Sequence, residues 1–227
     1  MAFTLDKVVP WGRSFDEYCA MFSLSEEDLK MRILGCSDGP ANFNCILTRR
    51  RGHVISIDPI YNFSADEIRL RINETYEEVM EQTRKNKDEF VWDNISSVEE
   101  LGRVRMEAMK EFLSDYPSGR KEGRYIEASL PTLKFKDGEF DIALCSHFLF
   151  LYSEQLSENF HIQSIRELCR VSSETRIFPL LELGAKKSRH FENIIDRLDK
   201  DGFTVSIEKV PYEFQKGGNK MLKIKHT

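Results

Sequence analysis

The sequence predicts a doubly wound α/β fold with a mostly parallel sheet. Two observations predict it: short apolar runs bounded by turn residues, and helical segments that alternate with them, a pattern typical of βαβ units with helices on both faces of a sheet. The chain has 227 residues, of which 41% are hydrophobic and 31% charged. This length and composition suit one α/β domain that carries an insertion, so we expect a single domain over residues 1–227.

Seven runs are expected to be strands. The last two flank residues 212–219 without a helical pattern between them, so an antiparallel hairpin should close the sheet. Pro179 cannot donate to a strand ladder and should lie near the end of its strand. The runs are 31–34, 53–57, 124–128, 140–145, 175–181, 203–210 and 220–225.

Three helix starts are marked by the capping pattern S-x-x-E, at Ser14, Ser64 and Ser97. The first lies in an N-terminal helical segment, residues 1–30. The other two lie in a long insertion, about residues 64–123, between the second and third expected strands. Apolar residues recur there at three- and four-residue steps, which predicts two amphipathic helices joined around Trp92.

Charge and cysteine content exclude several classes of function. The net charge is −5, so no global positive field attracts nucleic acid or an anionic membrane, and neither is expected as a partner. The five cysteines include no C-x-x-C pair, which disfavours a metal site and a disulfide framework and favours the reducing cytoplasm. The N-terminus lacks a signal-peptide pattern, and the most apolar run, 148–152, is too short to span a bilayer.

The most informative stretch is an apolar strand that runs into the turn Gly35-Cys36-Ser37-Asp38-Gly39. Small residues in such a turn let a nucleotide-like ligand approach the backbone. Asp58 follows Gly35 by 23 residues and ends the second expected strand, where a carboxylate can accept hydrogen bonds from both ribose hydroxyls. An ordinary turn and a loop-capping acid would explain either feature alone, but the two together at this spacing favour a nucleotide-like ligand.

Several segments resemble class I S-adenosylmethionine-dependent methyltransferases, in particular a largely uncharacterised bacterial group: GCSDGPANFN, ISIDPIY, FKDGEFDIALCSHFLFLYSE, RELCRVSSETRIFPLL and YEFQKGGN. The G-x-G-x-x-G of dinucleotide-binding proteins is absent. The resemblance implies a Rossmann-like seven-stranded sheet with an antiparallel last strand, and S-adenosylmethionine as the cofactor. The turn resembles the G-x-G-x-G of these methyltransferases, but its middle glycine is replaced by Ser37. The position two residues before Gly35, where many of them have Asp or Glu, is Ile33. Contacts to the methionine end are therefore expected to differ, with Asp38 or the N-terminal segment binding the amino group.

The resemblance also implies residue roles. The turn Gly35, Cys36, Ser37, Asp38 and Gly39 would hold the cofactor, Asp58 with Pro59 its ribose, Ser129 and Leu130 its adenine, and Ser146 the region of the methyl group. Arg13 and Tyr18 would close over the cofactor, because a guanidinium can pair with its carboxylate. An ordinary turn residue at Ser129 and a surface salt bridge at Arg13 are left open.

His147 and Tyr152 are the catalytic candidates. His147 could act as a general base or orient the acceptor, and a histidine that is merely hydrogen-bonded at a strand end fits as well. The same alternatives apply to Tyr152 and to His161. The segment around His147 lacks the Asn/Asp-Pro-Pro-Tyr turn of enzymes that methylate nucleic-acid amines, which favours a small acceptor.

The sequence thus predicts a methyltransferase that acts on a small organic molecule by direct in-line transfer. A macromolecule-directed methyltransferase and a non-catalytic protein that binds S-adenosylmethionine or S-adenosylhomocysteine are the alternatives. The acceptor, the methylated atom and a homo-oligomeric state are left open. The insertion is expected either to cover the site as a lid or to be permanent packing or a dimer surface.

Overall fold

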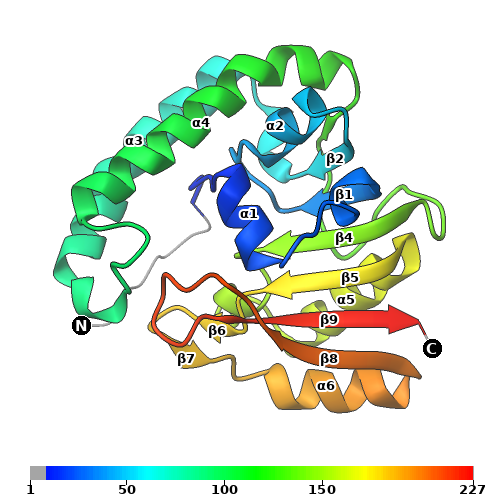
Figure 1. Ribbon diagram of the computed structural model, residues 1–227. Helices are drawn as coiled ribbons and strands as arrows, with labels where there is room; N and C mark the ends of the chain where they lie inside the picture. Colours follow the sequence, from blue (N-terminus) through cyan, green and yellow to red (C-terminus); the bar gives the residue numbers. More distant parts are fainter. Residues whose placement is uncertain (1–8, 227) are drawn as a thin grey trace.

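The computed structural model describes residues 9–226. Its main sheet has seven strands in the order β3-β2-β1-β4-β5-β9-β8 (Figure 1). The first five of these are parallel to one another, whereas β9 is antiparallel to both β5 and β8. The strands are β1 (Arg32–Cys36), β2 (His53–Ile57), β3 (Tyr125–Ile126), β4 (Phe140–Ser146), β5 (Ser172–Phe178), β8 (Phe203–Lys209) and β9 (Lys220–His226).

All seven expected strands are present, so the expected fold class is confirmed. The β3 strand is shorter than expected, and β5 begins three residues before its expected start. The β5 strand ends directly before Pro179, because proline has no N–H to donate to the ladder. Two short strands that were not predicted, β6 (Leu181–Glu182) and β7 (Lys186–Lys187), form a separate ladder after β5.

Alternating strand residues supply the two hydrophobic layers of the domain. Ile33 and Leu144 point to one face, where α1 (Phe15–Met21) and α2 (Phe43–Arg49) pack. Leu34 and Cys145, one position further along each strand, point to the opposite face, which α5 (Glu158–Val171) and α6 (Phe191–Lys200) cover. Side chains on a strand alternate in this way, so the doubly wound arrangement follows from apolar runs that are buried on both sides.

The three predicted helix starts are correct. Ser14 and Ser64 form complete capping boxes at α1 and at α3 (Ala65–Lys85). Ser97 caps α4 (Val98–Lys121) with its hydroxyl, but the Glu100 carboxylate accepts from Ser96 instead of returning to Ser97. The first eight residues of the expected segment 1–30 lie outside the described residues. The expectation that the N-terminus has no signal peptide concerns these residues.

The insertion consists of α3 and α4, and Trp92 lies in the segment that joins them. The two helices form a long arm beside the carboxyl ends of the parallel strands (Figure 1). At the root of the arm, their apolar faces pack on Tyr61, in the 3₁₀ helix η2 (Pro59–Asn62), and on Tyr125 of β3. Among residues 9–226, no helix is both long and apolar enough to cross a membrane.

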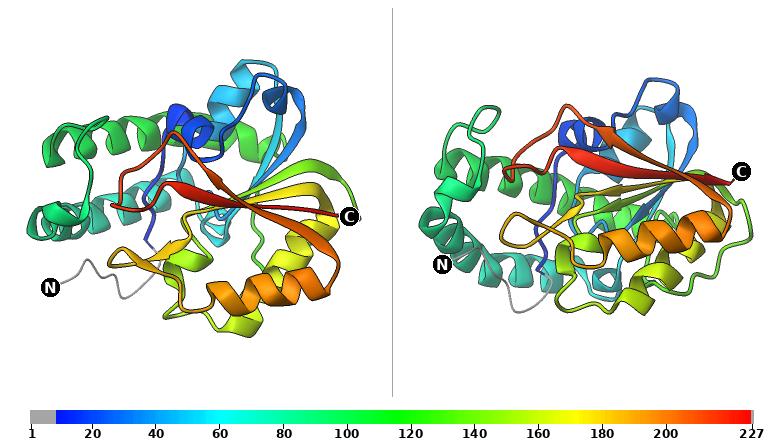
Figure 2. Two further views of the ribbon diagram at one scale, coloured as in Figure 1. Left: turned by 60° about the horizontal axis from the view of Figure 1, so that its bottom comes forward. Right: turned by 90° about the horizontal axis from the view of Figure 1, so that it is seen from below.

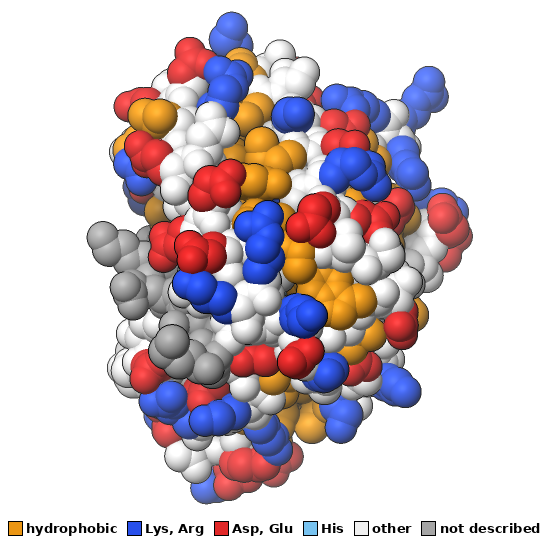
Figure 3. Space-filling model, turned by 90° about the vertical axis from the view of Figure 1, so that its left-hand side faces the viewer, with side chains coloured by type: hydrophobic (Ala, Val, Ile, Leu, Met, Phe, Trp, Pro, Cys, Tyr) orange, Lys and Arg blue, Asp and Glu red, His pale blue; other side chains and the backbone are white. Residues whose placement is uncertain are grey.

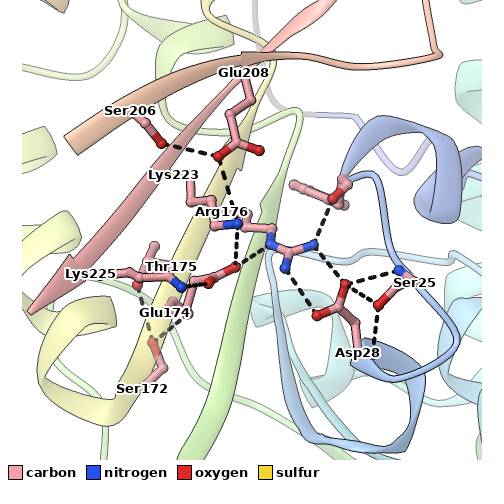
Figure 4. Close-up of polar contacts among 11 residues, drawn as sticks. Ser25, Asp28, Ser172, Glu174, Thr175, Arg176, Ser206, Glu208, Lys223 and Lys225 are labelled. Atoms are coloured by element: carbon pink, nitrogen blue, oxygen red, sulfur yellow. Dashed lines mark hydrogen bonds and ion pairs between the residues drawn. The ribbon is translucent and has the colours of Figure 1, made fainter. Parts of the chain in front are cut away.

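A buried arginine fastens the N-terminal region to the sheet. The guanidinium of Arg176 on β5 contacts Glu174 on its own strand, the carbonyl oxygen of Phe22 and the carboxylate of Asp28 in the 3₁₀ helix η1 (Asp28–Lys30) (Figure 4). Each of its three nitrogens has an acceptor, so this buried cation is fully compensated, as a stable interior position requires.

Candidate functional site

A cavity of about 810 Å³ lies at the carboxyl ends of the parallel strands. Its walls come from the residues after β1, β2, β4 and β5, from residues 9–13, from α3 and from the segment 212–218 that connects β8 to β9. Figure 3 shows the side of the molecule on which the arm lies, where hydrophobic side chains gather among charged ones. Ligands of open α/β sheets bind at this edge.

The cavity brings together nearly all residues that the sequence analysis singled out. Gly35 and Cys36, which end β1, and His161 on α5 do not line the cavity. The lining includes Arg13, Tyr18, Ser37, Asp38, Gly39, Asp58, Pro59, Ser129, Leu130, Ser146, His147 and Tyr152.

Gly35 is needed because the side chain of Asp38 occupies the space beside it. A Cβ atom at Gly35 would lie 1.8 Å from Asp38 Oδ2. The Asp38 carboxylate accepts hydrogen bonds from the hydroxyls of Tyr18, at 2.9 Å, and Ser56, at 2.6 Å. Asp38 thus holds the turn to α1 and β2, and burial raises its pKa to about 7.

Two residues of the turn have left-handed backbone conformations. Gly39 has φ +53° and Ser37 has φ +55°. Position 37, where related turns usually have a glycine, therefore has the left-handed backbone that favours glycine, although a serine occupies it here. The amide of Gly39 donates to Asp58 Oδ2 at 2.9 Å, and its carbonyl accepts from the Tyr61 hydroxyl at 2.7 Å. A Cβ at Gly39 would meet only Asp58 Oδ2, at 3.9 Å, so the space over this backbone is open to a ligand.

Asp58 joins the ends of β1 and β2. Its second oxygen, Oδ1, accepts from the amide of Ile60 at 2.8 Å, so each oxygen already has one backbone donor. A carboxylate has about four acceptor positions, which leaves capacity for ribose hydroxyls. Burial raises the pKa of Asp58 to about 6.

His147 follows β4 and faces the cavity with a left-handed φ of +50°. Its Nδ1 lies 2.9 Å from the Ser146 hydroxyl, and its amide donates to the carbonyl of Phe178. Burial holds its pKa well below the usual range, and the charges of Arg13 and Arg105 lower it further. The neutral imidazole is therefore favoured, and the same burial and charges disfavour the imidazolium that proton uptake would form. An uncommon backbone conformation of this kind is typical of functional sites.

The other two catalytic candidates differ in position. Tyr152 is buried and reaches the cavity. His161 lies on α5, away from the cavity, with one ring nitrogen 2.8 Å from the carbonyl oxygen of Ser157 and the other 2.8 Å from that of Leu149. His161 thus links two backbone segments beneath the site and does not meet a ligand in the cavity.

The sequence analysis missed a buried ionic cluster beside the cavity. Arg105 on α4 pairs with Glu17 on α1, whose other oxygen accepts from the Tyr212 hydroxyl at 2.9 Å. Tyr212 lines the cavity, and Arg105 is fully buried. A sequence signal existed, because Arg105 stands four residues after Leu101 on the apolar face of its helix, where a charge is unusual.

The α3 helix forms one wall of the cavity, and the tip of the arm is joined to the segment between β8 and β9. Figure 2 shows the tip of the arm near this segment. The amide of Val91 donates to the carbonyl of Phe214 at 2.7 Å, and that of Lys216 donates to the carbonyl of Glu89 at 2.9 Å. The rings of Phe90 and Phe214 stack with their centroids 4.8 Å apart. In this conformation α3 lines the cavity, and the tip of the arm is held to the segment 212–218, which lines it as well.

We expect S-adenosylhomocysteine to slow amide hydrogen exchange across residues 64–123, because a ligand beneath the arm stabilises its closed position. Phe214→Ala removes the stacked ring at the tip and should speed exchange at residues 86–92 in the ligand-free protein. Phe203→Ala, which removes a half-exposed aromatic ring from β8, is the control. Equal exchange with and without saturating ligand would mean that the arm is a permanent wall.

Among residues 9–226, no group of three or more His, Cys, Asp or Glu side chains has the arrangement of a metal site. The charged groups at the strand ends are instead held by hydrogen bonds to the protein itself, as at Asp38 and Asp58.

The chain is 38% identical over 223 residues to the uncharacterized protein MJ0045 of Methanocaldococcus jannaschii, and the alignment covers 97% of each chain. That relative comes from an archaeon, so the group extends beyond the expected bacteria. No protein-family profile matches.

Solved structures of S-adenosylmethionine-dependent methyltransferases are also similar. The magnesium protoporphyrin IX methyltransferase of Synechocystis PCC 6803, with bound S-adenosylmethionine, is 11% identical with a TM-score of 0.49 over 94% of this chain and 78% of that one. A TehB-like methyltransferase of Corynebacterium glutamicum is 12% identical with a TM-score of 0.46 over 87% and 80%. Likeness at this level carries no argument about activity.

Proposed function

We propose that this chain, which belongs to the same family as the uncharacterized protein MJ0045, is an S-adenosylmethionine-dependent methyltransferase that acts on a small organic acceptor. One observation carries the proposal: the turn from Gly35 to Gly39 is fastened to Asp58 and opens onto a covered cavity at the carboxyl ends of the strands. The antiparallel β9 agrees with the class I methyltransferase sheet that the sequence resembles.

The residues present fit this cofactor. The backbone of Gly39 is open to the cavity, and Asp58 keeps acceptor capacity for the ribose hydroxyls. Ser129 and Leu130 lie in the same wall and would meet the adenine, while Ser37, Tyr18 and Ser146 would surround the methionine end.

When bound, S-adenosylmethionine supplies a methyl group that its sulfonium has already activated. The protein then has to position a nucleophile in line with that methyl carbon and exclude water. His147 follows β4 as a neutral imidazole, so a ring nitrogen can accept a hydrogen bond from an acceptor hydroxyl or amine and orient it. Tyr152 and Ser146 also line the cavity and carry hydroxyls.

The size of the cavity favours a small acceptor. A volume of about 810 Å³ has to hold both the cofactor and the acceptor, which is within the usual range for small-molecule sites. The arm covers the cavity, and the net charge of −5 does not favour a nucleic acid as the acceptor.

Calorimetry with S-adenosylhomocysteine and NADH tests the cofactor assignment. We expect S-adenosylhomocysteine to bind and NADH not to bind, because the turn lacks the third glycine of the dinucleotide fingerprint. Transfer of label from methyl-labelled S-adenosylmethionine to a metabolite extract then tests catalysis. Binding without transfer to any fraction would favour the non-catalytic alternative, and tight binding of NADH alone would contradict the proposal.

A further inference from the structure

The cavity is bordered by a buried cluster with more positive than negative charge. Glu17 is the carboxylate of this cluster, and it is saturated by donors: Oε2 accepts from Arg105 Nη1 and from the amide and hydroxyl of Ser14, and Oε1 accepts from Tyr212. Arg13 lies beside the same cluster and lines the cavity. Two guanidinium groups therefore share one carboxylate.

Several nitrogens of these guanidinium groups are buried without a partner. Within residues 9–226, Arg105 Nε, Arg105 Nη2 and Arg13 Nε have no hydrogen-bond acceptor. Arg13 Nη1 donates to the carbonyl of Trp11 at 2.6 Å, which supplies no negative charge. Arg176, by contrast, has acceptors for all of its guanidinium nitrogens (Figure 4). Unpaired buried donors of a charged group are costly, and of the two guanidinium groups Arg13 is the one that lines the cavity, where an anion can reach it.

The acidic groups of the cavity do not supply this anion. Asp38 and Asp58 are held by hydrogen bonds at the ends of β1 and β2, and Glu74 and Glu78 are exposed on α3 beside Arg71. The cavity is therefore acidic where the proposed cofactor site lies and basic toward Arg13. A net-cationic cofactor fits the acidic end, and its carboxylate is accompanied by its own ammonium, so it brings no net negative charge to the basic end.

We propose that the methyl acceptor is a small organic acid whose anionic group binds Arg13, next to His147 and Tyr212. This inference rests on the proposed methyltransferase function. Arg13 supplies a guanidinium that can pair with a carboxylate through two hydrogen bonds. Arg105 and Glu17 are positioning residues, because they hold the Tyr212 hydroxyl and the start of α1 around the site. The sequence analysis assigned Arg13 to the cofactor's carboxylate, whereas the charge distribution favours the acceptor.

The test separates these two sources of the anion. In the wild type, Arg13→Gln, Arg13→Lys and Arg71→Gln, calorimetry measures the affinity for S-adenosylhomocysteine and for 5′-methylthioadenosine, which lacks the amino-acid part. A metabolite extract is divided on an anion exchanger at neutral pH, and each fraction is offered as acceptor with labelled S-adenosylmethionine. Arg71→Gln is the matched control, because it removes an exposed arginine from the same cavity.

We expect label transfer in the retained, anionic fraction. Arg13→Gln should raise the KM for this fraction about 10- to 100-fold, Arg13→Lys should raise it less, and Arg71→Gln should leave it unchanged. Affinity for S-adenosylhomocysteine should stay within about twofold in all variants. The ligand-free Arg13→Gln protein should be at least as stable as the wild type to urea, because the variant removes uncompensated buried charge.

Two results would overturn the inference while leaving the methyltransferase function intact. Acceptor activity confined to the unretained fraction would mean that the acceptor is not an anion. A loss of S-adenosylhomocysteine affinity in Arg13→Gln without a loss for 5′-methylthioadenosine would assign Arg13 to the cofactor's carboxylate. A wild-type protein that binds neither nucleoside and transfers no label would instead overturn the proposed function and this inference with it.

Discussion

Glu17→Gln is expected to lower the free energy of unfolding by about 3–5 kcal/mol. The substitution leaves Arg105, which is fully buried, and the adjacent Arg13 without the carboxylate that compensates them. It also removes the charged acceptor for the Tyr212 hydroxyl. Urea unfolding followed by circular dichroism measures the loss.

Matched variants distinguish the effect of losing the buried ion pair from the effect of losing any carboxylate charge. Glu27→Gln removes a carboxylate from an exposed pair with Lys30 and should change the stability by less than about 1 kcal/mol. Replacing Arg105 with Met as well as Glu17 with Gln should recover most of the loss, because Arg105, the fully buried guanidinium that pairs directly with Glu17, is then no longer left without a carboxylate. A cost below about 1 kcal/mol for Glu17→Gln alone would mean that water reaches the cluster.

The same pair makes the stability depend on pH. Burial alone would raise the pKa of Glu17, but the charge and hydrogen bond of Arg105 outweigh it and lower the pKa to about 2. The stabilisation is therefore present above the unfolded-state pKa of about 4.5 and is lost as the pH falls toward 2. Between pH 5 and pH 2, the wild type should lose more stability than the double variant.

Asp58→Asn is expected to weaken binding of S-adenosylhomocysteine by about 10- to 150-fold, because a charge-assisted acceptor for the ribose hydroxyls is lost. The amide keeps one oxygen, so it can still accept from either Gly39 or Ile60, and the variant should remain folded. Calorimetry measures the affinity. Asp141→Asn, which alters a partly exposed pair with Arg32 at the start of β4, should bind as the wild type does.

The pH dependence of binding provides a second readout for Asp58. Its pKa is raised to about 6 by burial, and ribose hydroxyls bind the ionised form. Affinity in the wild type should therefore fall as the pH is lowered from 7.5 to 5, and the part of this fall caused by Asp58 should be absent from Asp58→Asn. Burial, together with the charge of Asp58, raises the pKa of Asp38 to about 7 in the wild type, so Asp38 contributes to the pH dependence of the wild type as well. Equal pH profiles would exclude Asp58 from the ribose site.

Local patterns predicted the strands and helix starts because the forces that form them act between neighbours in the chain. Apolar runs become buried strands with alternating faces, and a serine three residues before a glutamate satisfies the first amides of a helix. The third capping box is incomplete because Ser96 competes for Glu100, which the spacing alone does not reveal.

The predicted site residues that follow strand ends lie around one cavity. Residues after β1, β2 and β4 meet at one edge because parallel strands share a direction, so Asp38, Asp58 and His147 face the same cavity. His161 was wrongly grouped with them, since its position on α5 turns it toward two backbone carbonyls. Ser37 and His147 have a left-handed φ. The sequence does not predict this conformation, because serine and histidine ordinarily avoid it.

The sequence by itself determined the order of strands and helices, the turn from Gly35 to Gly39 and its spacing to Asp58, because these depend on local chemistry and on the periodicity of apolar residues. The tertiary structure alone decided that Glu17, Arg105 and Tyr212, from three distant segments, form one buried cluster beside Arg13. Such contacts depend on how the arm and the β8–β9 segment fold back over the sheet. Their physical basis is charge compensation in a desolvated interior, which no pattern of neighbouring residues encodes.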